Sequence, residues 1–216
     1  MIVAPFRPLR YRTARAGRME DLVSPPYDVI GSRYRIELAR RNPFNVVRLI
    51  LPGGGGGRFS RAARLLEKWQ RQGILTRDAR PGLFPAVQEF RIGGRGDIRR
   101  LGFFGLLGFP GNPSGGTVLA HERTFSGPRK DREQMLQACR ADLEAILLLY
   151  SDPAGTVEKL LRRAIRKRPF TSFREEDESR CRVWKMEESP ATREIQAAMR
   201  RKDLLIADGH HRFASS

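Results

Sequence analysis

Apolar residues in this chain occur in short runs, and this feature limits the fold to short helices and strands. The longest runs are Leu101–Phe109 and Ala145–Tyr150, both far short of the ~20 residues that a membrane-spanning helix needs. Apolar residues nevertheless form 40% of the chain, which is enough to bury a core. The sequence therefore predicts a folded protein without a membrane-spanning segment.

Helical and strand patterns alternate along the chain, which predicts a mixed α/β fold. A glycine-rich turn at 93–96 joins two predicted strands in a hairpin. Residues 45–51 also read as a strand, because Val46, Val47 and Ile50 are β-branched. The predicted helices are 32–41, 59–72, 130–143, 157–165 and 191–201, and the predicted strands are 45–51, 83–92, 98–109, 146–150, 180–187 and 204–207.

The charge balance is strongly basic, with 41 basic and 24 acidic residues, a net charge of +17 and a pI near 11.2. Such an excess predicts an anionic partner such as nucleic acid, anionic lipid or a phosphorylated metabolite. However, only six of the basic residues are lysines, and the arginines are scattered. Codon use in a GC-rich genome gives the same excess, so both interpretations stay open.

The N-terminus and the cysteines indicate the compartment. Residues 1–6 lack a basic segment followed by an apolar one, so no secretory signal is predicted. Cys139 and Cys181 are the two cysteines, and they are interpreted as reduced thiols. The sequence therefore predicts a cytoplasmic protein.

The segment 204–212 contains two of the three histidines, directly after a predicted buried strand. Gly209 permits a tight turn or a close backbone approach. If a helix begins there, its free N–H groups face an anion, and His210, His211 and Arg212 add side-chain donors. Asp208 can bind Mg²⁺ or accept a proton. The alternative is a polar turn in which Asp208 caps a helix.

The third histidine, His121, begins a second polar segment that ends at Thr124. Glu122 is a candidate general base there, and Arg123 is a candidate phosphate clamp. A surface cluster of ion pairs is the alternative. A zinc site formed by the three histidines and Asp208 also stays open, although no zinc-ligand spacing requires it.

Several known motifs are excluded. The glycine run 53–57 is followed by Arg58 and Phe59 rather than by lysine and a hydroxyl residue, so it is not a P-loop. The nucleophile-elbow motif GxSxG and the zinc-protease motif HExxH are both absent from the sequence.

Several separate motifs in fixed order make the chain resemble the family catalogued as domain of unknown function 1015. The motifs are Pro5–Arg7, Pro25–Ile30, Asn45–Pro52, His121–Thr124, Gly127–Pro128 with Asp131–Arg132, Leu149–Pro153 and Ala207–Arg212. Family members normally continue well beyond the last motif, which implies that this chain is the N-terminal half of a longer one. The chain departs from the family at 142–145, which reads Asp-Leu-Glu-Ala where the family usually has Asn-Leu-Ser-Pro.

The string Asp-Gly-His-His-Arg at 208–212 also looks like the phosphate-binding box of the partition-protein and sulfiredoxin superfamily. Free-serine kinases of that superfamily carry the same string. Sulfiredoxin has a cysteine where this chain has His210, which argues against sulfiredoxin chemistry.

The resemblance implies an ATP-dependent kinase that uses Mg²⁺ and converts free L-serine to O-phosphoserine. The implied catalytic residues are Glu122, Asp208 and His211, and Asp208 also places the Mg²⁺. The nucleotide phosphates would lie on Gly209, His210, His211 and Arg212. The substrate would lie on His121, Arg123 and Thr124.

The predicted architecture is an N-terminal α/β segment over 1–80 and a partition/sulfiredoxin-like core over 81–216 that is incomplete at its C-terminal end. Two other functions stay open. One is a nucleotide-dependent module that binds nucleic acid, as partition proteins do. The other is a metal-dependent hydrolase that uses the three histidines.

Overall fold

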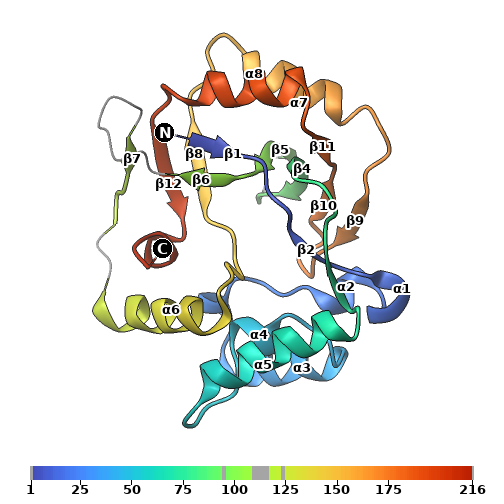
Figure 1. The fold of residues 1–216 in the computed structure, drawn as a ribbon, viewed down its shortest axis with the longest axis vertical. Coiled ribbons are helices and arrows are strands. Elements are labelled where there is room, and N and C mark those ends of the chain that lie inside the picture. Colours follow the sequence, from blue (N-terminus) through green and yellow to red (C-terminus); the bar gives the residue numbers. More distant parts are fainter. Residues whose placement is uncertain (1, 94–95, 109–116, 123–124, 216) are drawn as a thin grey trace. The chain divides into compact units, whose positions relative to one another are not determined.

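The computed structural model describes residues 2–93, 96–108, 117–122 and 125–215, and these form two compact units made of interleaved segments (Figure 1). The first unit comprises Met1–Pro8, Arg77–Leu119 and Leu149–Leu205, and the second comprises Leu9–Thr76, Ala120–Leu148 and Ile206–Ser216. The predicted boundary at residue 80 lies close to the passage from the second unit into the first, and it stays a prediction.

The first unit is built on a five-stranded antiparallel sheet. Its strands are β4 (Gly82–Arg91), β5 (Asp97–Phe104), β9 (Thr171–Arg174), β10 (Arg180–Val183) and β11 (Met186–Glu187). Both β5 and β10 pair with the same stretch of β4, so they lie on its two opposite edges. The hairpin predicted between 83 and 109 is therefore confirmed as β4 and β5.

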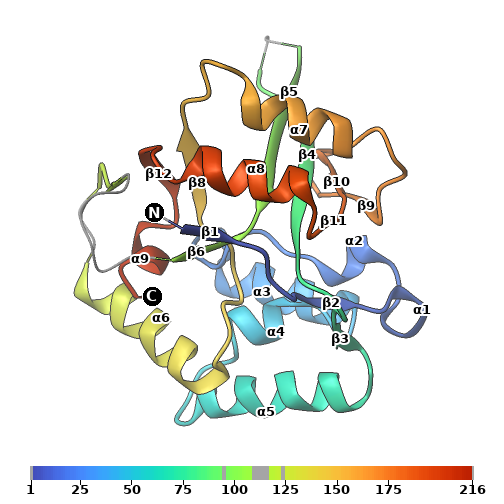
Figure 2. The same cartoon turned by 45° about the horizontal axis from the view of Figure 1, so that its top comes forward.

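Two helices and a strand pair complete the first unit (Figure 2). The helices α7 (Thr156–Ala164) and α8 (Pro190–Met199) contact each other, and α8 also contacts β1 (Ile2–Ala4), which pairs antiparallel with β6 (Leu106–Gly108). The helix α8 begins with a capping box in which Ser189 and Thr192 bond each other's backbone N–H groups. These contacts hold the first unit together around its sheet.

The second unit is mostly helical. Its helical elements are α1 (Thr13–Ala16), α2 (Met19–Leu22), the 3₁₀ turn η1 (Tyr27–Val29), α3 (Ser32–Arg41), α4 (Val47–Ile50), α5 (Arg58–Arg71), α6 (Ser126–Cys139) and α9 (His210–Phe213). A two-stranded sheet joins β2 (Leu9–Tyr11) to β3 (Leu75–Arg77). The helix α5 contacts both α4 and α6 (Figure 1).

The core of the second unit lies around Trp69, a buried residue of α5. The rings of Tyr11 and Phe44 lie 6.2 and 5.8 Å from the Trp69 ring. Buried Leu22, Leu49 and Ile74 belong to the same cluster. The helix predicted at 59–72 is confirmed as α5, and its buried residues Ala62, Leu66 and Trp69 form the face that this core covers.

The strand predicted at 45–51 is wrong, because part of this segment forms the helix α4. Asn45 is fully buried, and its side-chain amide donates to the carbonyls of Asp21 and Val23 while its Oδ1 accepts from Val47 N–H. These bonds fix a turn at the start of the segment. Local side-chain bonds and burial thus outweigh the β-propensity of two valines and an isoleucine.

A three-stranded sheet has the order β7 (Val118–Leu119), β12 (Leu204–Asp208) and β8 (Leu147–Tyr150), with β12 parallel to β7. The strands β8 and β12 each contain residues of both units. The predicted mixed α/β class is confirmed. Among the described residues, no helix has the length and apolar content to cross a membrane.

Candidate functional site

A tight turn follows β12 and carries the polar segment that the sequence singles out. Gly209 has φ of 95° and ψ of 32°, which is left-handed backbone that other residues adopt at a cost. A Cβ at this position would lie 2.9 Å from Nε of Arg212. The residue is therefore glycine for two reasons, the turn itself and the close approach of the Arg212 side chain.

A helix begins directly after this turn, as the sequence predicts. Only His210–Phe213 are helical, and the Phe213 N–H already donates to the carbonyl of Gly209. The donors that this segment offers to an anion are the side chains of His210, His211 and Arg212.

Arg212 is held in place by two oxygen partners. Its guanidinium pairs with the Asp208 carboxylate at 2.5 Å and donates to the carbonyl of Ala145 at 2.5 Å. The Arg212 side chain is almost fully buried, whereas that of Asp208 is 49% exposed. A buried guanidinium with a half-exposed carboxylate beside it presents both signs of charge at one place.

The structure brings Glu122 next to His210. Oε2 of Glu122 lies 3.4 Å from Nδ1 of His210, and Oε1 lies 3.8 Å from Nε2 of His121. The rings of His121 and His210 meet edge to face with centroids 4.6 Å apart. Two of the three histidines thus share one carboxylate, which is 65% exposed.

His210 is the buried member of this cluster, with a side chain only 5% exposed. Its Nε2 is buried and has no hydrogen-bond partner within the described part of the chain. A carboxylate opposite Nδ1 favours the tautomer with the proton on that nitrogen. Nε2 then carries a lone pair that can accept a hydrogen bond from a ligand donor.

His211 lies apart from the Glu122 contacts. Its ring is 6.2 Å from that of Phe125, and its carbonyl accepts from the Ser215 hydroxyl. Its Nδ1 is buried without a partner among the described residues. Arg123 and Thr124, which the sequence also assigns to the site, lie outside the described residues.

One small hollow collects most of the predicted site residues. It has a volume of about 70 Å³ and is lined by Tyr27, Asp28, Glu122, Ala207, Asp208, Gly209, His210, His211 and Arg212. We call it the first hollow. All of these residues belong to the second unit, although they come from three distant parts of the chain.

Tyr27 and Asp28 are lining residues that the sequence does not assign to the site. They follow Pro25–Pro26 and form the 3₁₀ turn η1. Burial raises the pKa of the Tyr27 hydroxyl. The signal that can find them is the rigid proline pair directly before two polar side chains, because prolines fix the direction in which the chain continues.

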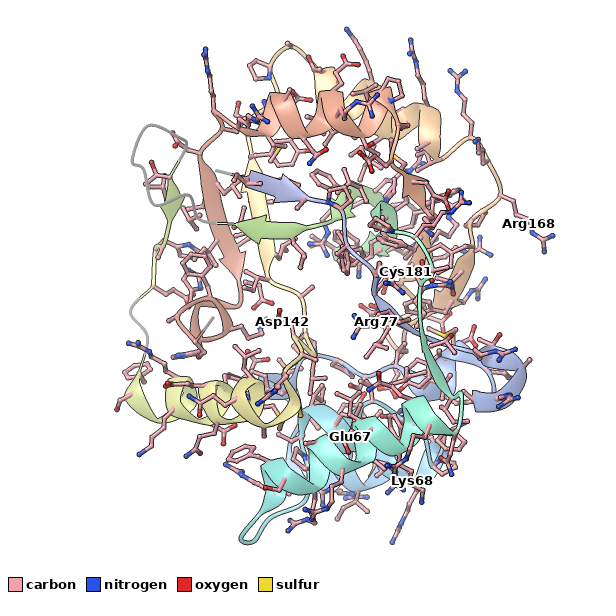
Figure 3. The ribbon with its side chains drawn as sticks, viewed as in Figure 1. Glu67, Lys68, Arg77, Asp142, Arg168 and Cys181 are labelled. Atoms are coloured by element: carbon pink, nitrogen blue, oxygen red, sulfur yellow. The ribbon has the colours of Figure 1, made fainter. Side chains whose placement is uncertain are left out.

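A second hollow of about 50 Å³ shares Arg212 with the first. It is lined by Arg132, Met135, Leu136, Ala141, Asp142, Leu143, Glu144, Ile146, Arg212 and Ser215. Asp142, labelled in Figure 3, and Glu144 both belong to the segment 142–145.

The described residues contain no group of three or more histidine, cysteine, aspartate and glutamate side chains that can hold a metal ion. The geometry thus gives no support to a zinc site built from Asp208 and the three histidines. A cation held by one or two carboxylates together with ligand phosphates has no such requirement.

A family model described as "Protein of unknown function (DUF1015)" matches residues 3–216. No curated protein matches the chain, and no solved structure matches it either.

Proposed function

The chain belongs to the DUF1015 family, and we propose from its own site that it is an ATP-dependent kinase of a small hydroxyl metabolite, converting free L-serine to O-phosphoserine. One observation carries the proposal. Glu122 lies beside His210, and both line one hollow with Asp208 and Arg212. Phosphoryl transfer depends mainly on positioning and on neutralising charge, and these are the side-chain types that it uses.

The first hollow suits phosphate groups. Its volume of about 70 Å³ takes a group of a few atoms, since one water occupies ~30 Å³ in the liquid. Arg212 supplies a charged donor whose position is fixed by Asp208 and the carbonyl of Ala145. Gly209, His210 and His211 form the rest of this wall. The remainder of the nucleotide would lie outside the hollow.

Two carboxylates in the first hollow fit a magnesium ion. Asp208 is half exposed, and Asp28 lines the same hollow. Mg²⁺ in phosphoryl-transfer sites is usually bound by one or two carboxylates together with substrate phosphates. When bound there, Mg²⁺ would neutralise charge on the phosphates.

Glu122 is the proposed acceptor of the hydroxyl proton, with Asp208 as the other candidate. In the reaction, the serine hydroxyl oxygen forms a bond to the γ-phosphorus, the bond from that phosphorus to the ADP oxygen breaks, and the hydroxyl proton passes to the carboxylate. The exposure of Glu122 leaves it open to a substrate, and Nδ1 of His210 lies 3.4 Å from its carboxylate. His121, Arg123 and Thr124 remain the predicted substrate contacts.

The choice of serine is supported by sequence likeness. The string at 208–212 is the one that free-serine kinases of the partition-protein and sulfiredoxin superfamily carry. The shared string supports the reaction class and the substrate, whereas the geometry of the first hollow supports the role proposed for each residue.

The test is ³¹P NMR of the product of the complete gene with ATP, Mg²⁺ and a panel of hydroxy amino acids. We expect an O-phosphoserine signal. Glu122→Ala should slow its formation about 10²–10⁴-fold, as loss of a general base does, and His211→Ala should also slow it. Glu67→Ala, an exposed carboxylate on α5 (Figure 3), is the matched control and should leave the rate unchanged. If the protein neither binds ATP nor phosphorylates any hydroxy amino acid, the proposal is wrong.

A second candidate is a module that binds nucleic acid, and the sheet of the first unit favours it. The register places Arg174, Arg180 and Arg99 in one cross-strand row that contains a single acidic residue, Glu89. Such a row can neutralise backbone phosphates. Its affinity for DNA or RNA should then fall steeply with salt, and binding without a salt dependence would dismiss this candidate.

A further inference from the structure

The second hollow has a mixed lining that no proposed role yet uses. Met135, Leu136, Leu143 and Ile146 give it apolar walls, and Arg132 and Glu144 give it buried charges. Since Arg212 lines both hollows, a ligand in the second hollow lies next to the place assigned to the phosphates.

Arg132, which lines this hollow, has one side-chain donor without a partner among the described residues. Its side chain is only 7% exposed, and its two terminal nitrogens are engaged by Asp131, Glu144 and the carbonyl of Ile50. Its guanidinium also lies 4.0 Å from the centre of the Tyr27 ring. The Nε–H, however, is buried and has no acceptor within the described residues. A buried donor without a partner is costly, so an acceptor from a ligand would complete it.

Glu144 is the opposite charge in the same hollow. Its Oε1 accepts from Tyr27 N–H at 3.0 Å, and its Oε2 lies 3.3 Å from Arg132. The side chain is 12% exposed, and burial raises its pKa. A ligand cation beside this carboxylate would offset the cost of its burial. Asp142 adds a second, exposed carboxylate at the rim.

We propose that the second hollow binds the amino-acid end of the phosphoryl acceptor, with the carboxylate at Arg132 Nε–H and the ammonium group at Glu144 and Asp142. The identity of this ligand as the acceptor rests on the proposed kinase function. In this assignment Arg132, Glu144 and Asp142 take the amino-acid end in place of the predicted contacts His121, Arg123 and Thr124. The substrate class is then a small α-amino acid with a side-chain hydroxyl. Hydroxy acids lack the ammonium group, and amino alcohols lack the carboxylate, so neither fills both positions.

Isothermal titration without ATP tests this site separately from catalysis. The ligands are L-serine, 3-hydroxypropionate and ethanolamine. We expect L-serine to bind at least 10-fold more tightly than either analogue. Glu144→Gln keeps an oxygen for Tyr27 N–H but removes the charge, so it should weaken L-serine binding at least 10-fold and leave 3-hydroxypropionate unchanged. Glu133→Gln, at an exposed position of α6, is the matched control and should change neither affinity.

A second variant guards against misfolding of the first. Ala141→Leu fills the hollow without touching a charge, and it should also weaken L-serine binding at least 10-fold. Equal affinity for the three ligands, or L-serine affinity unchanged in both variants, would overturn the proposal. If L-serine binds as expected but no phosphate is transferred, the kinase proposal fails while the amino-acid site stands.

Discussion

Glu89 in the first unit and Glu144 in the second each lie among arginines, but in different surroundings. Glu89 stands on the open sheet with Arg99 and Arg182 as its ion-pair partners, and its side chain is 35% exposed. Glu144 pairs with Arg132, and its side chain is 12% exposed. The same residue types thus form a partly exposed group of ion pairs in one unit and a buried ion pair in the other.

This difference in burial shows which arginines matter to the structure of their unit. Exposed ion pairs contribute little because water solvates both charges, whereas a buried charge that loses its partner is strongly unfavourable. The large excess of arginine therefore says little by itself. Burial separates Arg132 and Arg212, which line the hollows, from arginines that only cover the surface.

The largest contrast is expected from removing one arginine in each unit. Arg132→Met leaves Glu144 without its partner in a buried place, so it should lower the free energy of unfolding by about 3–5 kcal/mol. Arg99→Met removes an exposed partner of Glu89 and should cost about 0–1 kcal/mol. Urea unfolding followed by circular dichroism measures both. If both variants lose the same free energy of unfolding, burial does not make the ion pair of Glu144 stronger than that of Glu89.

A similar contrast is expected between two glycines with positive φ. Gly209→Ala adds left-handed strain and a clash with Arg212, and should cost about 2–3 kcal/mol. Gly155, before α7, has φ of 64°, and the nearest atom to an added Cβ is the flexible end of Lys159 at 3.9 Å. Gly155→Ala should therefore cost about 1 kcal/mol. Urea unfolding curves of the two variants measure these costs. A larger loss of unfolding free energy in Gly155→Ala than in Gly209→Ala would contradict the predicted clash with Arg212.

The pH dependence of stability should have opposite signs at two glutamates. Burial raises the pKa of Glu144 above its ordinary value of 4.5, so the native state holds that proton more tightly than the unfolded state. Wild-type stability should then fall relative to Glu144→Gln as the pH rises through the window above 4.5. Urea midpoints of the wild type and of Glu144→Gln between pH 3 and 8 measure this difference in stability.

Glu187 in β11 provides the comparison. A hydrogen bond from Lys185 lowers the pKa of Glu187 below 4.5, so its contribution to stability is present above that value and is lost as the pH falls below it. The disadvantage of Glu187→Gln should therefore disappear in acid. If the difference in unfolding free energy between wild type and variant changes in the same direction with pH at both glutamates, one of these environments is wrongly described.

The smallest effect concerns the cysteines and leaves stability unchanged. Burial raises the pKa of the Cys181 thiol to about 11. In a Cys139→Ser variant, alkylation at pH 8 should thus be about a hundredfold slower than for a free cysteine with a pKa of ~8.5. Urea should restore the rate. Burial also raises the pKa of Cys139, so the Cys181→Ser variant should react more slowly than a free thiol as well.

Much of the fold was predictable from local patterns. The helical pattern of α5 and the two strand patterns on either side of 93–96 are local signals, and the helix and the strand pair occur where the sequence places them. The failure at 45–51 has a nonlocal cause. Asn45 bonds to Asp21 and Val23, and no window around the two valines contains those partners.

The candidate site divides in the same way. The sequence singled out Glu122 and His210 by their residue type and their place after apolar runs, but their contact depends on packing between distant segments. Arg132 entered the sequence analysis only as part of a family motif, and Glu144 only as part of the segment 142–145. Their pairing and burial gave no signal, because a charged residue inside a helix and one in a loop usually face solvent. Burial of charge is a property of the assembled unit.

The interleaving of the second unit determines when the site can form during synthesis. Its three stretches are separated by segments of the first unit, and the last one begins at Ile206. A ribosome therefore releases Glu122, Arg132 and Glu144 well before the residues that complete both hollows. Until Arg212 emerges, the buried carboxylates of this unit lack one of their cations. We therefore expect this part of the nascent chain to stay unfolded until then. Neither hollow can consequently be complete before Arg212 has emerged.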